Sequence, residues 1–285
     1  MNTTFSNTDI ADYYDQTEIH YRRGWKLSEN LALHYGYWDD KTSNLSEALQ
    51  RMNERLAELG HITTTDYVLD SGCGVGGSSI FLARTIGCRT KGITLSAKQV
   101  ESASRYAKDR QVDHLCSFEQ KDYTQTGYPD ATFDVVWAIE SSGTAPDKMA
   151  FINEAYRILK PGGRLVIADV YRGKEHMSEL DNKRLLKVLN GWAMTDVDTP
   201  DVFKKKLEQG GFQQVKHLDI SAHIQRSATR IFWGGISMFF IAHIYKLFNP
   251  KVRHFAHNHY KALVWQYPTL RKKLWAYCMV YAEKK

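Results

Sequence analysis

A glycine-rich turn is the first stretch of the sequence whose residue types and spacing could do chemistry. Residues 67–70 read YVLD, residues 71–77 read SGCGVGG, and a helix-like IFLARTI follows at 80–86. Glycines allow a sharp turn from a strand into a helix and let a ligand approach the backbone closely. We therefore predict a nucleotide-type cofactor at this turn. Dinucleotide-binding dehydrogenases have a similar turn, so the neighbouring strands must discriminate.

Polar groups follow the next two predicted strands. The second strand ends in GITLS at 92–96, with Gln99 close behind, which offers hydroxyl and amide groups to a ribose. The third ends at Asp122 and Tyr123, a carboxylate that can accept an adenine amino proton beside an aromatic ring. The ribose would thus meet hydroxyl and amide groups in place of the lone acid expected at a dinucleotide site, and these neighbours are the decisive features.

Strand-like and helix-like segments alternate through the middle of the chain, which predicts βαβ units and a parallel sheet. Ser96 can cap the helix that begins at 97. In such a sheet, ligands bind at the carboxyl ends of the strands. Predicted strands lie at 67–70, 89–95, 117–122, 133–142 and 164–170, predicted helices at 80–86, 97–110 and 147–159, and a KPGG turn at 160–163.

Two further strands are predicted at 213–221 and from 274 onward, with about fifty residues between them. That insert is too apolar for a solvated linker and too long for a hairpin, so we expect a helical lid. Its most apolar part, 231–248, contains His243, Lys246 and two glycines, which indicates a pocket-lining or interfacial helix rather than a membrane-spanning one. The predicted division is a lid at 1–60, a cofactor-binding core at 61–221, the insert at 222–272 and a final core strand at 273–285.

The sequence resembles the class I S-adenosylmethionine-dependent methyltransferases through LDSGCGVGG, GITLSAKQ, QKDYTQ and ILKPGGRLVIAD. With DYYDQTEIHYRRGW and HYGYWDD, it is similar to the tocopherol, sterol and cyclopropane-forming C-methyltransferases, and also to bacterial farnesyl diphosphate C-methyltransferases of the sodorifen type. This resemblance implies an α/β, Rossmann-like fold: a seven-stranded, mostly parallel sheet with helices on both faces, an N-terminal helical lid and a helical insert before the last strand.

The resemblance also implies the cofactor, S-adenosylmethionine, and the residues that contact it. The glycines would line its methionine and ribose parts, Thr94 and Gln99 its ribose and Asp122 its adenine, while Tyr14 would close over the methionyl end. The acid that often follows the second strand in this family is missing here. The full predicted set is Tyr14, Asp70, Gly72, Gly74, Gly76, Thr94, Leu95, Gln99, Asp122 and Tyr123.

Glu140, at the end of the fourth predicted strand, is the main catalytic candidate. In an apolar pocket its pKa would rise, and it could act as a base or stabilise a cation. The alternative is that it holds the cofactor amine or a nearby loop. His176 is a weaker candidate that reads more as a surface histidine, and Tyr37 is a third.

Aromatic residues crowd the N-terminal segment, where Tyr37 and Trp38 stand together. An alkene that attacks a sulfonium methyl becomes a cation, and aromatic walls that exclude water suit that chemistry. We therefore assign Trp38 to substrate binding. The alternative is that these rings pack the lid onto the core.

The C-terminal part is basic. From Lys216 onward there are twelve Lys and Arg against two acids, a balance of +10, while the whole chain carries +6, so the remainder is at −4. Arg253, His257 and Lys261 would share one face of a helix that Asn249 caps, with Pro250 in its first turn and Pro268 limiting its length.

Cations near a helix N-terminus repel one another and oppose the helix dipole. A bound diphosphate would relieve this unfavourable electrostatic energy. We assign Arg253, His257 and Lys261 to substrate binding. A solvated basic face is the alternative, and contact with nucleic acid or, through Phe239 and Phe240, with a membrane surface is also open. His254, His257 and His259 lack metal-ligand spacing, so no metal site is predicted.

The favoured function is C-methylation of an alkene in a hydrophobic isoprenoid, most of all a prenyl diphosphate such as farnesyl diphosphate, with cyclisation of the resulting cation as an optional sequel. This would be a step of terpene biosynthesis, and Mg²⁺ could accompany the diphosphate. The alternatives are methylation of a sterol, quinol or alkaloid-like amine, and a nucleic-acid methyltransferase or binding module, although no nucleic acid is expected. The N-terminal residues do not form a signal peptide, so we expect a cytoplasmic enzyme. The sequence makes no prediction about oligomeric state.

Overall fold

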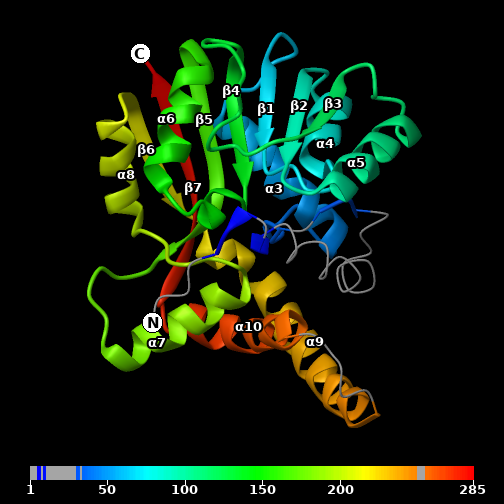
Figure 1. The fold of residues 1–285 in the computed structure, drawn as a ribbon, viewed down its shortest axis with the longest axis vertical. Helices are drawn as coiled ribbons and strands as arrows, with labels where there is room; N and C mark the ends of the chain where they lie inside the picture. The colour runs from blue at the N-terminus through cyan, green and yellow to red at the C-terminus, as the bar shows by residue number, and fades with distance from the viewer. Residues whose placement is uncertain (1–4, 8, 11–29, 33, 249–253) are drawn as a thin grey trace.

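The protein is built on one seven-stranded sheet with the strand order β3-β2-β1-β4-β5-β7-β6 (Figure 1). The structure, a computed structural model, describes residues 5–7, 9–10, 30–32, 34–248 and 254–285, but not the side chains of 238–261. Strands β1 to β5 are parallel, and β7 pairs antiparallel with both β5 and β6. The strands are β1 (Tyr67–Ser71), β2 (Arg89–Thr94), β3 (Cys116–Gln120), β4 (Phe133–Ile139), β5 (Leu159–Arg172), β6 (Phe212–Asp219) and β7 (Trp275–Lys284).

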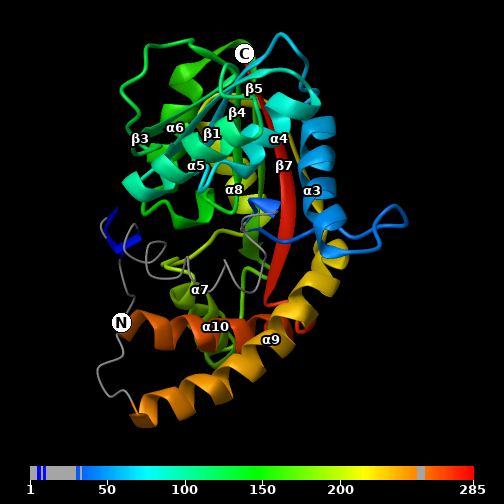
Figure 2. The same cartoon turned by 90° about the vertical axis from the view of Figure 1, so that its right-hand side faces the viewer.

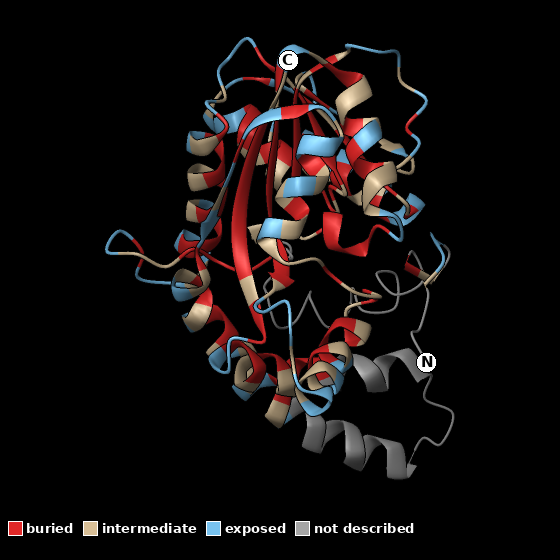
Figure 3. Ribbon diagram, turned by 90° about the vertical axis from the view of Figure 1, so that its left-hand side faces the viewer, coloured by how far each residue is buried: buried red, intermediate tan, exposed pale blue. Residues whose placement is uncertain are grey.

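Alternate residues of each strand point to opposite sides of the sheet, and both of these faces are buried. Val166 and Ala168 of β5 belong to one hydrophobic cluster, whereas Leu165 and Ile167 belong to the other. The near-continuous apolar runs of β4 and β5 follow from this burial on two sides (Figure 3).

Helices cover both faces (Figures 1 and 2). On one side lie α3 (Leu45–Leu59), α4 (Gly77–Thr85) and α5 (Ala97–Asp109), and on the other lie α6 (Lys148–Ile158) and α8 (Pro200–Gln209). Side-chain caps start most of them: Ser96 accepts from the Gln99 amide at α5 and Asp147 from the Met149 amide at α6. The predicted cap at Ser96 is therefore confirmed.

Three helices lie beyond the carboxyl ends of the parallel strands (Figures 1 and 2). They are α7 (Glu179–Gly191), α9 (Ser221–Phe248) and α10 (His254–Arg271), and α10 packs against both α7 and α9. Because β7 runs antiparallel to β5, the α9–α10 insert returns the chain to the edge where the parallel strands end. A short 3-10 helix, η1 (Ser142–Thr144), follows β4 at this edge.

The predicted seven-stranded Rossmann-like sheet and the helical nature of the insert are confirmed. Two details differ. The KPGG stretch is an irregularity inside β5, with Gly162 at φ 73° and a register shift opposite Phe133/Val135. The described part of α10 starts at His254 and continues through Pro268 to Arg271, whereas Asn249 and Pro250, the predicted cap and first turn, lie outside the described residues.

No helix in the described ranges is long and apolar enough to cross a membrane, α9 included.

Candidate active site

A pocket opens at the carboxyl ends of β1, β2 and β4, where the sequence predicted the site. One end is formed by the glycine turn and the residues after β2. The other end is closed by residues from outside the core: Leu31, Ala32, His34 and Tyr35, the loop after α7, and the helices α9 and α10. The pocket therefore joins a half that contains the glycine turn and several polar residues to a half that is mostly apolar.

The glycine turn brings bare backbone to the pocket. Gly72 and Gly74 line it, with φ values of 88° and 52°. A Cβ on Gly72 would lie 2.3 Å from the Cβ of Ser141, so only glycine fits this approach of β1 to the end of β4. Gly76 has φ 85° and caps α4 without a side-chain hydrogen bond. Amides of the first turn of α4 are thus left without side-chain caps, and Gly77 lines the pocket.

These features suit the cofactor implied by the resemblance. A positive helix end beside a glycine-lined wall fits an anionic group such as a methionyl carboxylate. Thr94 and Gln99 line the same half, and the Thr94 hydroxyl donates to Oε1 of Gln99 at 2.6 Å. Leu95, between the two, adds an apolar surface there.

Asp70 also lines the pocket and is almost fully buried. The Ser79 hydroxyl donates to its Oδ2 at 2.7 Å. Burial raises the pKa of Asp70 to about 6, and the bond from Ser79 opposes that rise. Asp70 therefore connects the end of β1, at the pocket, to the first turn of α4 through this hydrogen bond.

Of the two predicted site residues that follow β3, only Tyr123 lines the pocket. Asp122 does not line the pocket, and its carboxylate accepts hydrogen bonds from Asn7 Nδ2 at 2.6 Å and from the Thr124 amide at 2.7 Å. Tyr123 does line it, but its hydroxyl donates to the Ser141 carbonyl at 2.8 Å. Burial raises the pKa of Tyr123, so this phenol stays neutral. The adenine role of Asp122 stays a prediction.

Glu140 stands where the two halves of the pocket meet. It follows β4 with φ 49°, a left-handed backbone that is unfavourable for a residue with a side chain. Its Oε1 accepts the Tyr35 amide at 2.7 Å and the Tyr277 hydroxyl at 2.8 Å. Burial raises the pKa of Glu140 to about 8, with the two donors opposing the rise. Burial thus favours the protonated form of this carboxyl group near neutral pH.

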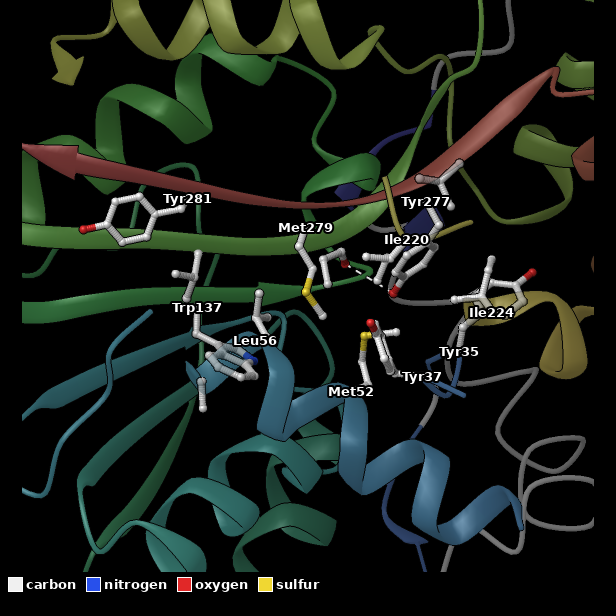
Figure 4. Packing of buried hydrophobic residues seen from close by; sticks show 14 of the residues in the cluster. Tyr35, Tyr37, Met52, Leu56, Trp137, Ile220, Ile224, Tyr277, Met279 and Tyr281 are labelled. Atoms are coloured by element: carbon white, nitrogen blue, oxygen red, sulfur yellow. Dashed lines mark hydrogen bonds between the residues drawn. The ribbon is translucent and has the colours of Figure 1, made fainter. Parts of the chain in front are cut away.

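Tyr35 connects Glu140 to the insert. Its amide donates to Glu140, and its hydroxyl donates to Oε1 of Gln266 on α10. Its ring packs against Trp275 and Tyr277, with centroid separations of 6.0 and 5.6 Å. Figure 4 shows Tyr35 and Tyr277 close together beneath β7.

Apolar side chains form the rest of this half of the pocket. Trp192 and Met194 come from the segment after α7, Ile231 from α9 and Leu263 from α10. His34 also lines the wall, and burial lowers its pKa to about 4, so this imidazole is neutral. The walls described here carry no positive charge at neutral pH. They suit a hydrophobic ligand.

Several predicted residues lie elsewhere. Tyr37 is buried in the core, stacked on His223 at 4.1 Å and 10°. Trp38 donates its indole N–H to Ser227 at 2.8 Å and lies beneath the Arg226 guanidinium. Both hold residues 35–38 against α9, and neither lines the pocket. These contacts agree with the alternative stated for the aromatic residues, in which they pack the N-terminal segment against the rest of the protein.

His176 is exposed in the segment between β5 and α7, away from the pocket. Tyr14 and Arg253 lie outside the described residues, and His257 and Lys261 belong to α10 without described side chains. Their roles stay predictions. In the part of the chain that the structure describes, no group of three His, Cys, Asp or Glu is placed to hold a metal ion, and all four cysteines are buried and free.

Sequence reasoning did not assign a site role to Tyr277 or Gln266, and it counted Tyr35 only among the crowded N-terminal aromatic residues. Tyr277 is hidden in the alternating pattern of the last strand, far along the chain from Glu140. Gln266 had a local signal, because it is a lone amide in the apolar run ALVWQYP. Such an amide in a buried helix requires a polar partner.

Comparison with known proteins identifies the family. A methyltransferase domain model matches residues 69–167, which contain the glycine turn and Glu140. A 27-O-demethylrifamycin SV methyltransferase of Amycolatopsis mediterranei is 37% identical over 199 residues, covering 70% of this chain and 72% of that protein. Tocopherol O-methyltransferase of Arabidopsis thaliana is 30% identical over 232 residues, covering 75% of this chain and 66% of that protein.

A solved structure shows the same fold. The geranyl diphosphate C-methyltransferase of Streptomyces coelicolor, in complex with Mg²⁺, geranyl diphosphate and S-adenosyl-L-homocysteine, superposes with a TM-score of 0.75 over 100% of both chains at 19% identity. The resemblance to the class I S-adenosylmethionine-dependent methyltransferases is confirmed by these relatives. The chain belongs to the class I S-adenosylmethionine-dependent methyltransferases, and S-adenosylmethionine is its methyl donor.

Proposed function

We propose that this methyltransferase methylates an alkene carbon of a hydrophobic isoprenoid, most of all a prenyl diphosphate such as farnesyl diphosphate. The observation that carries the proposal is Glu140, a carboxyl group with a pKa of about 8 beside an apolar wall. When bound, S-adenosylmethionine supplies an electrophilic methyl group. Glu140 supplies what the acceptor needs afterwards, which is a place for a proton.

An alkene that gains a methyl group gains one positive charge. Loss of a proton from a neighbouring carbon restores a neutral alkene, and an ionised Glu140 can take that proton. Oε1 is held by Tyr35 and Tyr277, so Oε2, which has no partner among the described residues, is the oxygen left for this exchange. Tyr35 and Trp192 would stabilise the charge before the proton leaves, while the apolar walls keep water out.

Cofactor contacts are part of the proposal. Gly72, Gly74 and the first turn of α4 would hold the methionyl part, and Thr94 and Gln99 the ribose, because all of them line one half of the pocket. The diphosphate would be held by the basic residues around the start of α10, with Arg253, His257 and Lys261 as first candidates, and any Mg²⁺ would arrive with the diphosphate. A cytoplasmic location and a place in terpene biosynthesis complete the proposal.

A hydroxyl group of another hydrophobic compound is the second candidate acceptor. The similarity to a methyltransferase whose name specifies O-methylation favours it. The same Glu140 could accept a hydroxyl proton, so the carboxylate alone does not distinguish the two reactions.

Mass spectrometry and NMR after incubation with S-[methyl-¹³C]adenosylmethionine would separate them. The panel contains geranyl and farnesyl diphosphate, farnesol, a sterol and a prenylated quinol. The proposal expects a new ¹³C–C bond on a prenyl diphosphate. A ¹³C–O bond on a quinol would favour the second candidate, and the absence of any prenyl product would refute the first.

A further inference from the structure

Gln266 places an amide where the apolar wall of the pocket would otherwise be continuous. It belongs to α10, lines the pocket beside Leu263, and its residue exposure is only 1%. Buried side-chain amides normally have their hydrogen-bonding capacity satisfied. Its contacts therefore indicate what the pocket is built to receive.

One end of this amide is fixed. The Tyr35 hydroxyl donates to Oε1, and the Tyr35 ring is wedged between Trp275 and Tyr277. Because Oε1 is held as an acceptor, Nε2 must be the end that offers hydrogens. A tyrosine hydroxyl can donate or accept, so the orientation of the amide follows from the Leu263 carbonyl at its other end, which can only accept and therefore faces Nε2.

The other end of the amide, Nε2, makes only one weak hydrogen bond with the described residues. Nε2 reaches the Leu263 carbonyl of its own helix at 3.5 Å, the outer limit of a hydrogen bond. Its second N–H has no partner among the described residues. A buried donor left without a partner costs about 1–3 kcal/mol. A ligand oxygen in the pocket would remove that cost.

Tyr35 also sets where this donor lies relative to the chemistry. Its backbone amide holds Glu140, and its hydroxyl holds Gln266. The proton acceptor and the amide donor are thus separated by a single tyrosine. A ligand oxygen that reaches Nε2 therefore lies about one tyrosine side chain away from the atom that reacts beside Glu140.

We propose that Gln266 determines specificity by donating a hydrogen bond from Nε2 to an oxygen of the acceptor, which selects hydrophobic acceptors with a hydroxyl, carbonyl or ester oxygen about one tyrosine side chain away from the methylated atom. This inference rests on the proposed methylation of a hydrophobic acceptor in this pocket, and it names a feature of that acceptor. A site that hydrogen-bonds an oxygen discriminates strongly against the analogue that lacks it, because its polar group is then left buried and unpaired.

Binding of two matched probes tests the proposal independently of turnover. The probes are farnesol and the hydrocarbon of the same carbon skeleton without the hydroxyl, titrated against the protein saturated with S-adenosylhomocysteine. Quenching of tryptophan fluorescence reports binding, since Trp192 lines the pocket. The wild type should bind farnesol about tenfold more tightly than the hydrocarbon.

Gln266→Met keeps the volume and removes the donor, so the preference for farnesol should fall to about twofold or less. The double variant Tyr35→Phe/Gln266→Met removes both partners of the hydrogen bond and should show the same loss without an unpaired hydroxyl to destabilise the fold. Leu263→Met is the matched control, because it changes the same wall without touching a polar group, and it should keep the preference.

An unchanged preference in Gln266→Met or in the double variant, with the fold intact by circular dichroism, would overturn the proposal. Equal binding of the two probes by the wild type, or binding of neither, would overturn it too. Failure of the proposed function has a different signature, namely no methyl transfer to a prenyl compound while the farnesol preference persists.

Discussion

The Tyr277 hydroxyl donates to Oε1 of Glu140 at 2.8 Å, so the last strand of the sheet holds the carboxyl group that follows β4. The Tyr35 amide donates to the same oxygen at 2.7 Å. Both donors favour the ionised carboxylate, while burial favours the protonated form and prevails, raising the pKa to about 8. The protonation of Glu140 is therefore set by residues from both ends of the chain.

Tyr277→Phe should shift the pH profile of the enzyme. Without this donor the ionised form of Glu140 is less stable, so the apparent pKa in the kcat/KM profile should rise by about one unit. If ionised Glu140 is the base, activity at pH 7 falls about tenfold. Tyr281→Phe is the control, since Tyr281 lies on the same strand but donates to Glu283 at 3.1 Å, away from the pocket. Equal profiles for the two variants would contradict this account.

Glu140→Gln should change how stability depends on pH. Between its ordinary pKa of 4.5 and the folded value of about 8, the folded protein keeps a proton that the unfolded chain releases. The contribution of Glu140 to stability therefore falls as pH rises through this window, by about 1.4 kcal/mol per unit. The amide introduced by the substitution does not titrate. The free energy of unfolding of the variant should therefore increase relative to that of the wild type from pH 5 to pH 8. Urea unfolding at both pH values measures the gain, and a difference independent of pH would exclude the raised pKa.

Ser227→Ala should loosen residues 35–38 from α9. The Ser227 hydroxyl accepts hydrogen bonds from the Gly36 amide at 3.1 Å and from the Trp38 indole at 2.8 Å, and it is buried. Loss of this acceptor leaves two donors unpaired and should lower the free energy of unfolding by about 1–3 kcal/mol. Ser237→Ala, an exposed site on the same helix, should stay within about 0.5 kcal/mol. Comparable losses at the two sites in urea unfolding would argue against this anchoring.

Gly74→Ala should weaken cofactor binding more than it weakens the fold. Gly74 lines the pocket at φ 52°, so an added methyl group would stand at the wall proposed to contact the methionyl part of the cofactor. Calorimetry with S-adenosylhomocysteine should show at least a tenfold loss of affinity, about 1.4 kcal/mol. Gly162→Ala carries the same kind of backbone strain, with φ 73° and no neighbour within 4 Å, and should bind normally. Normal binding by Gly74→Ala would remove the glycine turn from the cofactor site.

Local patterns were sufficient to predict the core. The Ser96 cap, the β1–turn–α4 unit and the position of Glu140 at the edge of the sheet depend on residues close in sequence, and each lies where its pattern indicates. The final strand and the helical insert also followed from length and apolar pattern. These features are set by neighbouring residues along the chain.

Contacts across the fold were not predictable in the same way. Tyr37 and Trp38 were interpreted as site residues because of their type, but their hydrogen bonds and stacking partners on α9 lie far along the chain. Gln266 and Tyr277 gain their meaning only when β7 and α10 meet Glu140 and Tyr35. Residue type shows what a side chain can do, and tertiary packing decides which partner it has.

Methyl transfer by the wild type and by Glu140→Gln tests the central claim most directly. Labelled S-adenosylmethionine and farnesyl diphosphate are the substrates, and the Kd of S-adenosylhomocysteine is measured on the same two proteins. With Glu140 as proton acceptor, kcat of the variant should fall about a hundredfold or more while the Kd changes by less than about twofold. An unchanged kcat, or equal losses in kcat and in cofactor affinity, would contradict this role and assign Glu140 to holding the cofactor or its loop.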